Sequence, residues 1–244
     1  MGALAFVDGR LHVGALNFSD YTERVEVAID CNVVEWRPIS SPWIQRRQGG
    51  KTVGFSAGGA WDAGTGLPDS AFSLHGSVDT PTTICTQSAV GSIAYFFPSV
   101  PATYNVDGPA AELLRFQITA PISSGRAVRG HVLHTADTAT VATGNDTGVQ
   151  IGAVGATQRL YAALHVFSLS GTTPTVDVKI QSDDNSGFTS ATDRITFTQV
   201  SGSGSTGSQI TSVAGAITDD YFRVVATLGG TSPSTTFCVV CGIA

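Results

Sequence analysis

The chain of 244 residues carries a net charge of −6, and only 13% of its residues are charged, against roughly 25% in typical soluble domains. It has two lysines, Lys51 and Lys179, and no basic half, which argues against tight nucleic-acid binding because phosphate neutralisation needs clustered positive charge. A weakly charged surface suits subunits that bury their exterior against copies of themselves, so we expect a homo-oligomer.

The N-terminus, MGALAFVDGR, has no basic segment followed by an apolar one, and no run of about 18 apolar residues occurs. We therefore expect synthesis in the cytoplasm and no membrane anchor. Four cysteines are too few and too scattered for a disulfide framework, and we expect them to be reduced, buried and small hydrophobic in character. They are Cys31, Cys85, Cys238 and Cys241.

Residues 24–34, RVEVAIDCNVV, alternate apolar and polar side chains with a period of two, which predicts a half-buried strand. Its apolar parity, from Val25 to Val33, is expected in the core. Glu26, Asp30 and Asn32 lie on the polar parity. Open solvent and the interior of an assembly remain equal alternatives for this acidic face, because alternation defines a face but not its neighbour.

Residues 37–51, RPISSPWIQRRQGGK, contain two prolines and a glycine pair, which predicts a long exposed loop. Long loops usually have a function. This loop offers the mixture of aromatic, apolar and basic groups that is enriched at interface hot spots, unless Trp43 folds back onto its own domain. The residues concerned are Trp43, Ile44, Arg46, Arg47 and Lys51.

Further strands are predicted over 51–63, 90–97, 113–120 and 126–134, and a short helix over 67–76, where Pro68 stands in the first turn and Gly76 ends it. A stretch of small and polar residues follows, and it places a domain boundary near 137, between a domain 1–136 and a domain 137–244. Beyond it, five apolar or alternating segments separated by turn signals predict an antiparallel β-sandwich.

Gly54-Phe-Ser56-Ala-Gly58 matches the nucleophile elbow of α/β-hydrolases, and Asp107 and His131 follow in the expected order. An elbow needs a helix after the serine, whereas Ser56 precedes small and glycine residues that form helices poorly. We therefore interpret the segment as a glycine-rich strand and expect no catalytic residue.

Cys238-Val-Val-Cys241 has C-x-x-C spacing, but residues three apart in a strand point to opposite faces. The same geometry counts against His131 and His134, so no metal site and no cofactor is expected.

His165 lies in a strand that is apolar on both faces, which indicates a core or interface histidine. His12 and His75 have no carboxylate, serine or cysteine partner at the sequence spacing of a catalytic motif.

Residues 181–197, QSDDNSGFTSATDRITF, place three aspartates around an Asn-Ser-Gly turn. Turn chemistry is the favoured interpretation, because Asp and Asn cap turns through their side chains. The stretch lacks the ligands that a calcium-binding loop requires, since Gly187 stands at the fifth position and no glutamate follows. A carboxylate pair for sugar hydrolysis is the remaining alternative.

The order of these features resembles the tail tube, or major tail, proteins of long-tailed siphovirus-type bacteriophages. The resemblance covers residues 8 to about 134 and rests on FSDYTERVEVAID, GGKTVGFSAGGAWDAG, the short helix PDSAFSLHG and the late strand RAVRGHVL. Residues 158–243 are similar to the β-sandwich that some phage tail proteins append, through RLYAALHVFSLSG and QSDDNSGFTSATDRITF.

The resemblance implies an all-β fold, in which a domain of two packed sheets with one flanking helix precedes an outer sandwich. It also implies a virion tail protein, not an enzyme, whose hexameric rings stack into a tube that conducts DNA. Expected partners are further copies, the tape measure, terminator and tip proteins, and DNA in transit. The loop from Ser40 to Lys51 would then contact the next ring, and Glu26, Asp30 and Asn32 would line the lumen.

Two other classes remain open. A capsid decoration or tail-fibre-like protein would share the β architecture and form a trimer or spike. A carbohydrate-binding module would use exposed aromatic side chains, but residues 137–244 contain no tryptophan. An esterase acting through Ser56 is a more distant alternative.

Overall fold

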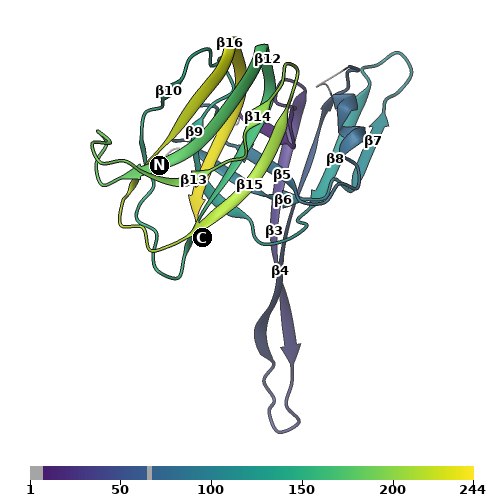
Figure 1. Ribbon diagram of the computed structural model, residues 1–244. Helices are drawn as coiled ribbons and strands as arrows, with labels where there is room; N and C mark the ends of the chain where they lie inside the picture. The colour runs from purple at the N-terminus through teal and green to yellow at the C-terminus, as the bar shows by residue number, and fades with distance from the viewer. Residues whose placement is uncertain (1–7, 65–67) are drawn as a thin grey trace.

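The computed structural model describes residues 8–64 and 68–244, and the chain is all-β with one short 3₁₀ helix, η1 (Pro68–Leu74) (Figure 1). The N-terminal residues 1–7 and Leu67, the first residue of the predicted helix, lie outside the described residues. Within the described ranges every strand pair is antiparallel, and the strands form one large and one small sheet. The described helix, at seven residues, is too short to cross a membrane.

The smaller sheet has four strands in the order β3, β4, β8, β7. They are β3 (Thr22–Trp36), β4 (Gln45–Ala60), β8 (Arg115–Pro121) and β7 (Thr103–Asp107). The larger sheet runs β13, β12, β16, β9, β6, β5, β1, β2, and four short strands pair with β12 or β16 outside this path.

The path of the larger sheet consists of β13 (Thr192–Thr196), β12 (Arg159–Asp183), β16 (Tyr221–Ile243), β9 (Val128–His134), β6 (Ile93–Ser99), β5 (Thr80–Cys85), β1 (Arg10–Val13) and β2 (Leu16–Asn17). The strands outside the path are β10 (Gly144–Asn145), β11 (Val149–Gln150), β14 (Val200–Ser201) and β15 (Gly207–Ala214).

Four of the predicted C-terminal strands are in fact two. Strands β12 and β16 each run through a segment predicted as a turn, and they stay paired across bulges near Ser170 and Thr172. Gly230, at φ +96°, provides the left-handed backbone there, and a Cβ at this position would lie 2.6 Å from the Thr172 carbonyl oxygen. The glycines therefore bend the long strand pair without interrupting it.

This bend produces two packed layers from one strand pair. Leu164 in the first half of β12 and Val178 in its second half belong to the same buried cluster, together with Phe222 and Val239 of β16. The C-terminal region is therefore built as a folded-over ribbon, whose two halves bury one core.

Residues 45–51 of the predicted loop 37–51 belong to a strand, because β3 and β4 pair from the body as far as Trp36 and Gln45. Only residues 37–44 connect them. The prediction that the glycine pair prevents strand pairing is wrong. Gly49 instead allows close approach at a bulge, where an added Cβ would lie 2.9 Å from the Asn32 carbonyl oxygen.

The long hairpin also changes the predicted burial. It extends away from the body (Figure 1), so Ile29, Val33 and Cys31 are exposed although their parity predicted core positions. The alternation in this strand was recognised correctly, but only Val25 and Val27 reach the core, where they pack on the edge of the cluster between the sheets.

That cluster joins the two sheets. Phe55 of β4 and Phe116 of β8 face Leu11 of β1 and Phe97 of β6, and η1 adds Ala71. The larger sheet continues across the predicted domain boundary near 137, because Val132 of β9 pairs with Val240 of β16. The division into domains 1–136 and 137–244 stays a prediction.

Candidate assembly surfaces

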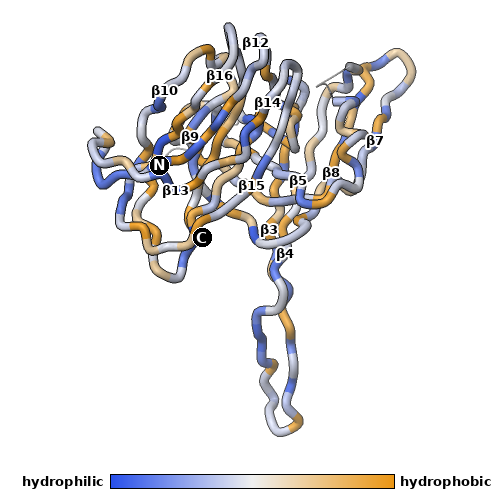
Figure 2. Tube along the Cα trace, viewed as in Figure 1, coloured by the Kyte–Doolittle hydropathy of each residue, from blue (hydrophilic) through white to orange (hydrophobic). Residues whose placement is uncertain are grey.

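The β3–β4 hairpin exposes an unusual number of apolar side chains. Trp43 is 78% exposed and Ile44 54% exposed, and Figure 2 shows apolar segments along both strands and at the tip. Trp43 therefore does not fold back onto its own domain. A concentration of exposed apolar side chains of this kind is typical of an interaction site. The large apolar side chains exposed on the hairpin are Ile29, Val33, Val34, Trp36, Ile39, Trp43 and Ile44.

Three basic residues of the hairpin lie on β4, and Arg37 lies in the connection at the tip. The Arg46 guanidinium pairs with the Glu35 carboxylate, and the Arg47 guanidinium lies 5.0 Å from the centre of the Trp36 ring. Segment 33–51 contains four basic residues and one acidic residue, for a charge of +3. The remainder of the chain, with nine basic and eighteen acidic residues, carries −9.

The second surface is the open face of the smaller sheet. The register sets Glu26 opposite Ser56 and Asp30 opposite Thr52, with Thr119 of β8 opposite Ser56 on its other side. Their neighbours on β4, such as Phe55, face the core instead. The open face thus carries small and polar side chains, including two of the three predicted acidic-face residues. Asn32 lies at the bulge, where the alternation is interrupted.

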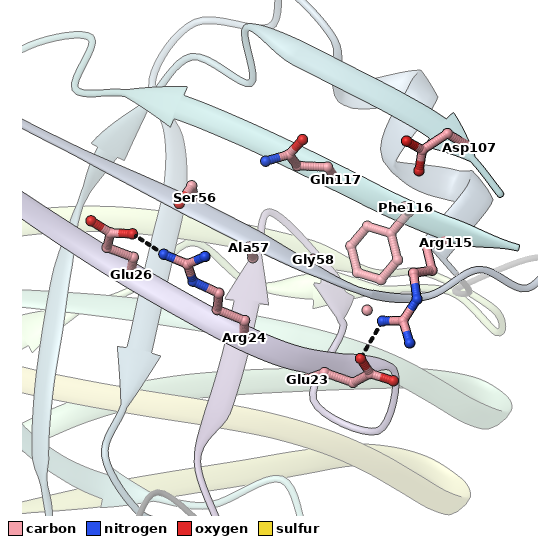
Figure 3. A pocket seen from close by; sticks show the side chains of 11 residues that line it. Glu23, Arg24, Glu26, Ser56, Ala57, Gly58, Asp107, Arg115, Phe116 and Gln117 are labelled. Carbon is pink, nitrogen blue, oxygen red and sulfur yellow. Dashed lines mark hydrogen bonds and ion pairs between the residues drawn. The ribbon is translucent and has the colours of Figure 1, made fainter. Parts of the chain in front are cut away.

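Ion pairs reduce the acidity of this face. Arg24 donates to the Glu26 carboxylate across 2.8 Å, and Arg115 pairs with Glu23 (Figure 3). These four residues line a shallow depression of about 540 Å³, together with Ser56 and Gln117. The sequence suggested an acidic face, whereas the structure gives one whose charges are mostly paired. Such a face has no cluster of free cations for phosphate groups.

The hydrolase motif does not form an elbow. Ser56 lies within β4, which continues as a strand to Ala60, as predicted for a glycine-rich segment. His131 lies in β9 of the other sheet, where its Nδ1 contacts the Gly91 carbonyl oxygen at 2.9 Å. The third motif residue, Asp107, ends β7 at the rim of the depression. The three residues do not form a hydrogen-bonded triad among the residues described.

The aspartate-rich stretch 181–197 forms the connection between β12 and β13. The Asp183 carboxylate accepts hydrogen bonds from the backbone N–H groups of Asn185 and Ser190, at 3.3 and 2.8 Å. The side chain of Asn185 accepts from the Gly187 N–H at 2.9 Å. These bonds confirm the predicted turn chemistry, in which Asp and Asn side chains cap the turn.

His165 is a buried histidine, as predicted. Its Nδ1 lies 2.7 Å from the Gly14 carbonyl oxygen, and its Nε2 lies 2.7 Å from the Thr83 hydroxyl. A carbonyl only accepts, so Nδ1 carries the proton and Nε2 accepts from Thr83. Burial lowers the pKa of His165 to about 4, so the ring is neutral. It ties β12 to the β1–β2 turn and to β5.

Cys238 and Cys241 lie on opposite faces of β16, as the spacing predicts, since Cys238 packs in one buried cluster and Cys241 in another. Sequence analysis missed a different grouping, in which His12 and Cys85 lie beside Cys238. These residues come from three distant strands, so no local spacing in the sequence signals their proximity.

No protein-family model matches the sequence, and no curated protein matches it significantly. Among solved structures, the chain is similar to a component of a native gene transfer agent virion (12% identity, 51% of this chain, 97% of that chain, TM-score 0.42). It is also similar to a chain from the sheath/tube terminator of an extracellular contractile injection system, PVC (10% identity, 53% and 97%, TM-score 0.43).

A third similar structure is the SPP1 Dit (gp 19.1) protein, described as a paradigm of the hub adsorption apparatus in phages that infect Gram-positive bacteria. That likeness spans 97% of this chain and 99% of the other, at 10% identity and a TM-score of 0.37. All three likenesses have TM-scores below 0.5, and the function of this chain is inferred from its own surfaces.

Proposed function

We propose that this chain is a structural subunit of a phage-type tail, whose hexameric rings stack into a tube that conducts DNA. The observation that carries the proposal is the exposed β3–β4 hairpin, which presents apolar side chains and a charge of +3 beside a body that carries −9. In an isolated monomer this apolar hairpin stays exposed to water, which is unfavourable. In an assembly, the positively charged hairpin complements the acidic body of a second copy.

The edges of the smaller sheet support ring formation. Strands β3 and β7 lie at its two ends, and each has one side without a strand partner among the described residues. Open edges invite pairing with other chains. If β3 of one copy pairs with β7 of the next, a closed ring of copies satisfies both edges of the smaller sheet and forms a continuous barrel.

The open face of the smaller sheet would then line the lumen. Its small polar residues and paired charges offer DNA no cluster of cations to hold it, so the phosphate backbone slides past. The hairpin would extend from each ring to the next, and the sandwich 137–244 would stand outside the tube. The chain acts in the virion tail, without catalysis or a cofactor.

Negative-stain electron microscopy of the purified protein tests this proposal. Hexameric rings or tubes are expected, and a variant in which Asn-Gly replaces residues 37–44 should form rings that no longer stack. A control variant that replaces Val141, an exposed residue on another part of the surface, should polymerise normally. Trimers or spikes would instead favour a decoration or fibre protein, and stable monomers would refute the tube.

A further inference from the structure

Three chemically active side chains that are distant in the sequence meet inside the larger sheet. They are His12 of β1, Cys85 of β5 and Cys238 of β16, and all three are buried. A ligand atom of each, an imidazole nitrogen or a thiol sulfur, lies within 4.8 Å of the other two. Two strands separate β5 from β16 in the sheet order, so curling of the sheet brings these side chains together across its inner face.

The imidazole of His12 has an unmet bonding requirement. Its Nδ1 is buried and has no hydrogen-bond partner in the part of the chain that the structure describes, whereas both nitrogens of the neighbouring His165 are bonded. Leaving a buried polar atom unpaired is unfavourable. A neutral imidazole has one nitrogen with a free lone pair, which can bond to a metal ion.

We propose that His12, Cys85 and Cys238 form a binding site for a thiophilic cation, with Zn²⁺ as the favoured ion. Two sulfur ligands and one imidazole suit zinc or copper(I) and disfavour magnesium and calcium, which take oxygen ligands. Charge then favours zinc, because two thiolates and a neutral imidazole cancel the charge of Zn²⁺. A neutral complex is less costly to bury than a charged one.

Binding requires a modest contraction of the site. Tetrahedral zinc, with bonds of about 2.3 Å to sulfur and about 2.0 Å to nitrogen, separates its ligand atoms by about 3.5–3.8 Å. In this structure the three ligand atoms lie within 4.8 Å of one another. Each cysteine thiol releases its proton to solvent as its sulfur bonds to the ion, so one Zn²⁺ displaces two protons. The fourth coordination position is left to a water or another small ligand.

The site would connect the first described strand of the chain, β1, to the last, β16. His12 stands near the start of the chain and Cys238 near its end, on strands β1 and β16, which are not neighbours in the sheet. A shared ion binds the folded state and not the extended chain, so it would stabilise the closed form of the curled sheet.

The test uses the full chain, produced in medium supplemented with zinc or with cobalt and purified under reducing conditions. We expect about one equivalent of zinc by elemental analysis, because a buried site retains its ion. The cobalt protein should show the thiolate-to-cobalt charge-transfer band in the near ultraviolet. The zinc protein should melt about 5–10 °C above protein stripped of metal by unfolding and refolding with a chelator.

Two cysteine variants of the same strand provide the matched comparison. Cys238→Ala should lose the metal and the charge-transfer band, whereas Cys241→Ala, which removes an equally buried thiol on the opposite face of β16, should keep both. Circular dichroism checks folding. If Cys238→Ala does not fold, His12→Gln and the metal content of the unmodified protein still decide the question.

Three results would overturn the site. The first is unmodified protein that lacks zinc while its thiols are reduced, and the second is equal metal content in both cysteine variants. The third is a Cys85–Cys238 disulfide in the purified protein, detected by mass spectrometry, which would assign the paired thiols to a covalent cross-link instead.

Discussion

His165 shows how one side chain couples pH to the stability of this fold. Its neutral ring bridges Gly14 and Thr83, and His12 lies beside it with a ring-centre distance of 5.6 Å. Both rings are buried and uncharged in the folded chain, because burial lowers the pKa of each. In the unfolded chain, histidine takes up a proton near pH 6.5.

Lowering the pH should therefore destabilise the protein already at pH values well above those at which carboxylates titrate. The pKa of His165 is about 4 when folded and 6.5 when unfolded, so its stabilising effect is complete above pH 6.5 and declines as the pH falls towards 4. Between pH 7 and pH 4.5 the free energy of unfolding should fall by about 2 kcal/mol from this residue alone.

Urea unfolding at the two pH values measures this effect. His165→Gln should be less stable at pH 7 and should show a smaller decrease with acid than the unmodified chain. His75→Gln, which changes an exposed ring bonded to the Ala102 carbonyl, should leave the decrease unchanged. An identical decrease in all three proteins would refute the role of His165.

Substitution of Trp43 gives the most direct test of the assembly hypothesis. Its side chain is 78% exposed, so Trp43→Ser should change the free energy of unfolding by less than about 0.5 kcal/mol. If the tryptophan anchors a neighbouring copy, the same change should weaken polymerisation at least about tenfold, as hot-spot tryptophans do.

The critical concentration for polymer formation, measured by sedimentation, reports this change. Phe72→Ser is the matched control, because Phe72 is similarly exposed, at 70%, but lies on η1 away from the hairpin. Polymerisation that is impaired equally by both variants would point to a general loss of apolar surface, not to a site on the hairpin.

At the scale of the element, the bends of β12 and β16 decide how the sandwich forms. Gly230 adopts φ +96° and lies so close to Thr172 and Thr173 that a Cβ would meet their carbonyl oxygens at 2.6 Å. Gly230→Ala should therefore cost about 2–3 kcal/mol of unfolding free energy, combining backbone strain with displacement of the partner strand.

Gly125→Ala separates these two contributions. Gly125 also has a positive φ, +69°, but nothing lies within 4 Å of the added Cβ, so only backbone strain of about 1 kcal/mol is expected. Urea midpoints of both variants provide the comparison. Equal losses would show that the close strand contact at Gly230 has no energetic consequence.

At the scale of the whole molecule, the separation of charge makes a prediction about assembly. The hairpin segment 33–51 carries +3 and the rest of the chain −9, so contact between copies brings opposite charges together. Exposed charges are screened over about 10 Å at 0.1 M salt. Raising salt from about 50 mM to about 500 mM should therefore increase the concentration needed for polymer formation.

Lys51→Gln and Arg47→Gln should each reduce this salt dependence, because each removes a hairpin charge. Arg126→Gln, outside the hairpin, serves as the control. Light scattering over a salt series measures the trend. Polymers that strengthen with salt would assign the contact to apolar surface alone, and the charge separation would then have no part in assembly.

Local sequence patterns were sufficient to predict an all-β chain, the short helix around Ala71 and the turn built on Asp183, because each depends on neighbouring residues. Alternation likewise placed Glu26 and Asp30 on one face, since a strand repeats every two residues. The assignment of Trp43 and Ile44 to an exposed segment followed from the local prolines.

Only the tertiary structure decided which alternating strands are buried, that glycine pairs bend the strands without ending them, and that Arg24 neutralises Glu26. It also brought His12, Cys85 and Cys238 together. Side-chain alternation is a property of adjacent residues, but burial and ligand grouping depend on contacts between distant strands. Those contacts are determined by how the larger sheet curls, which no local pattern encodes.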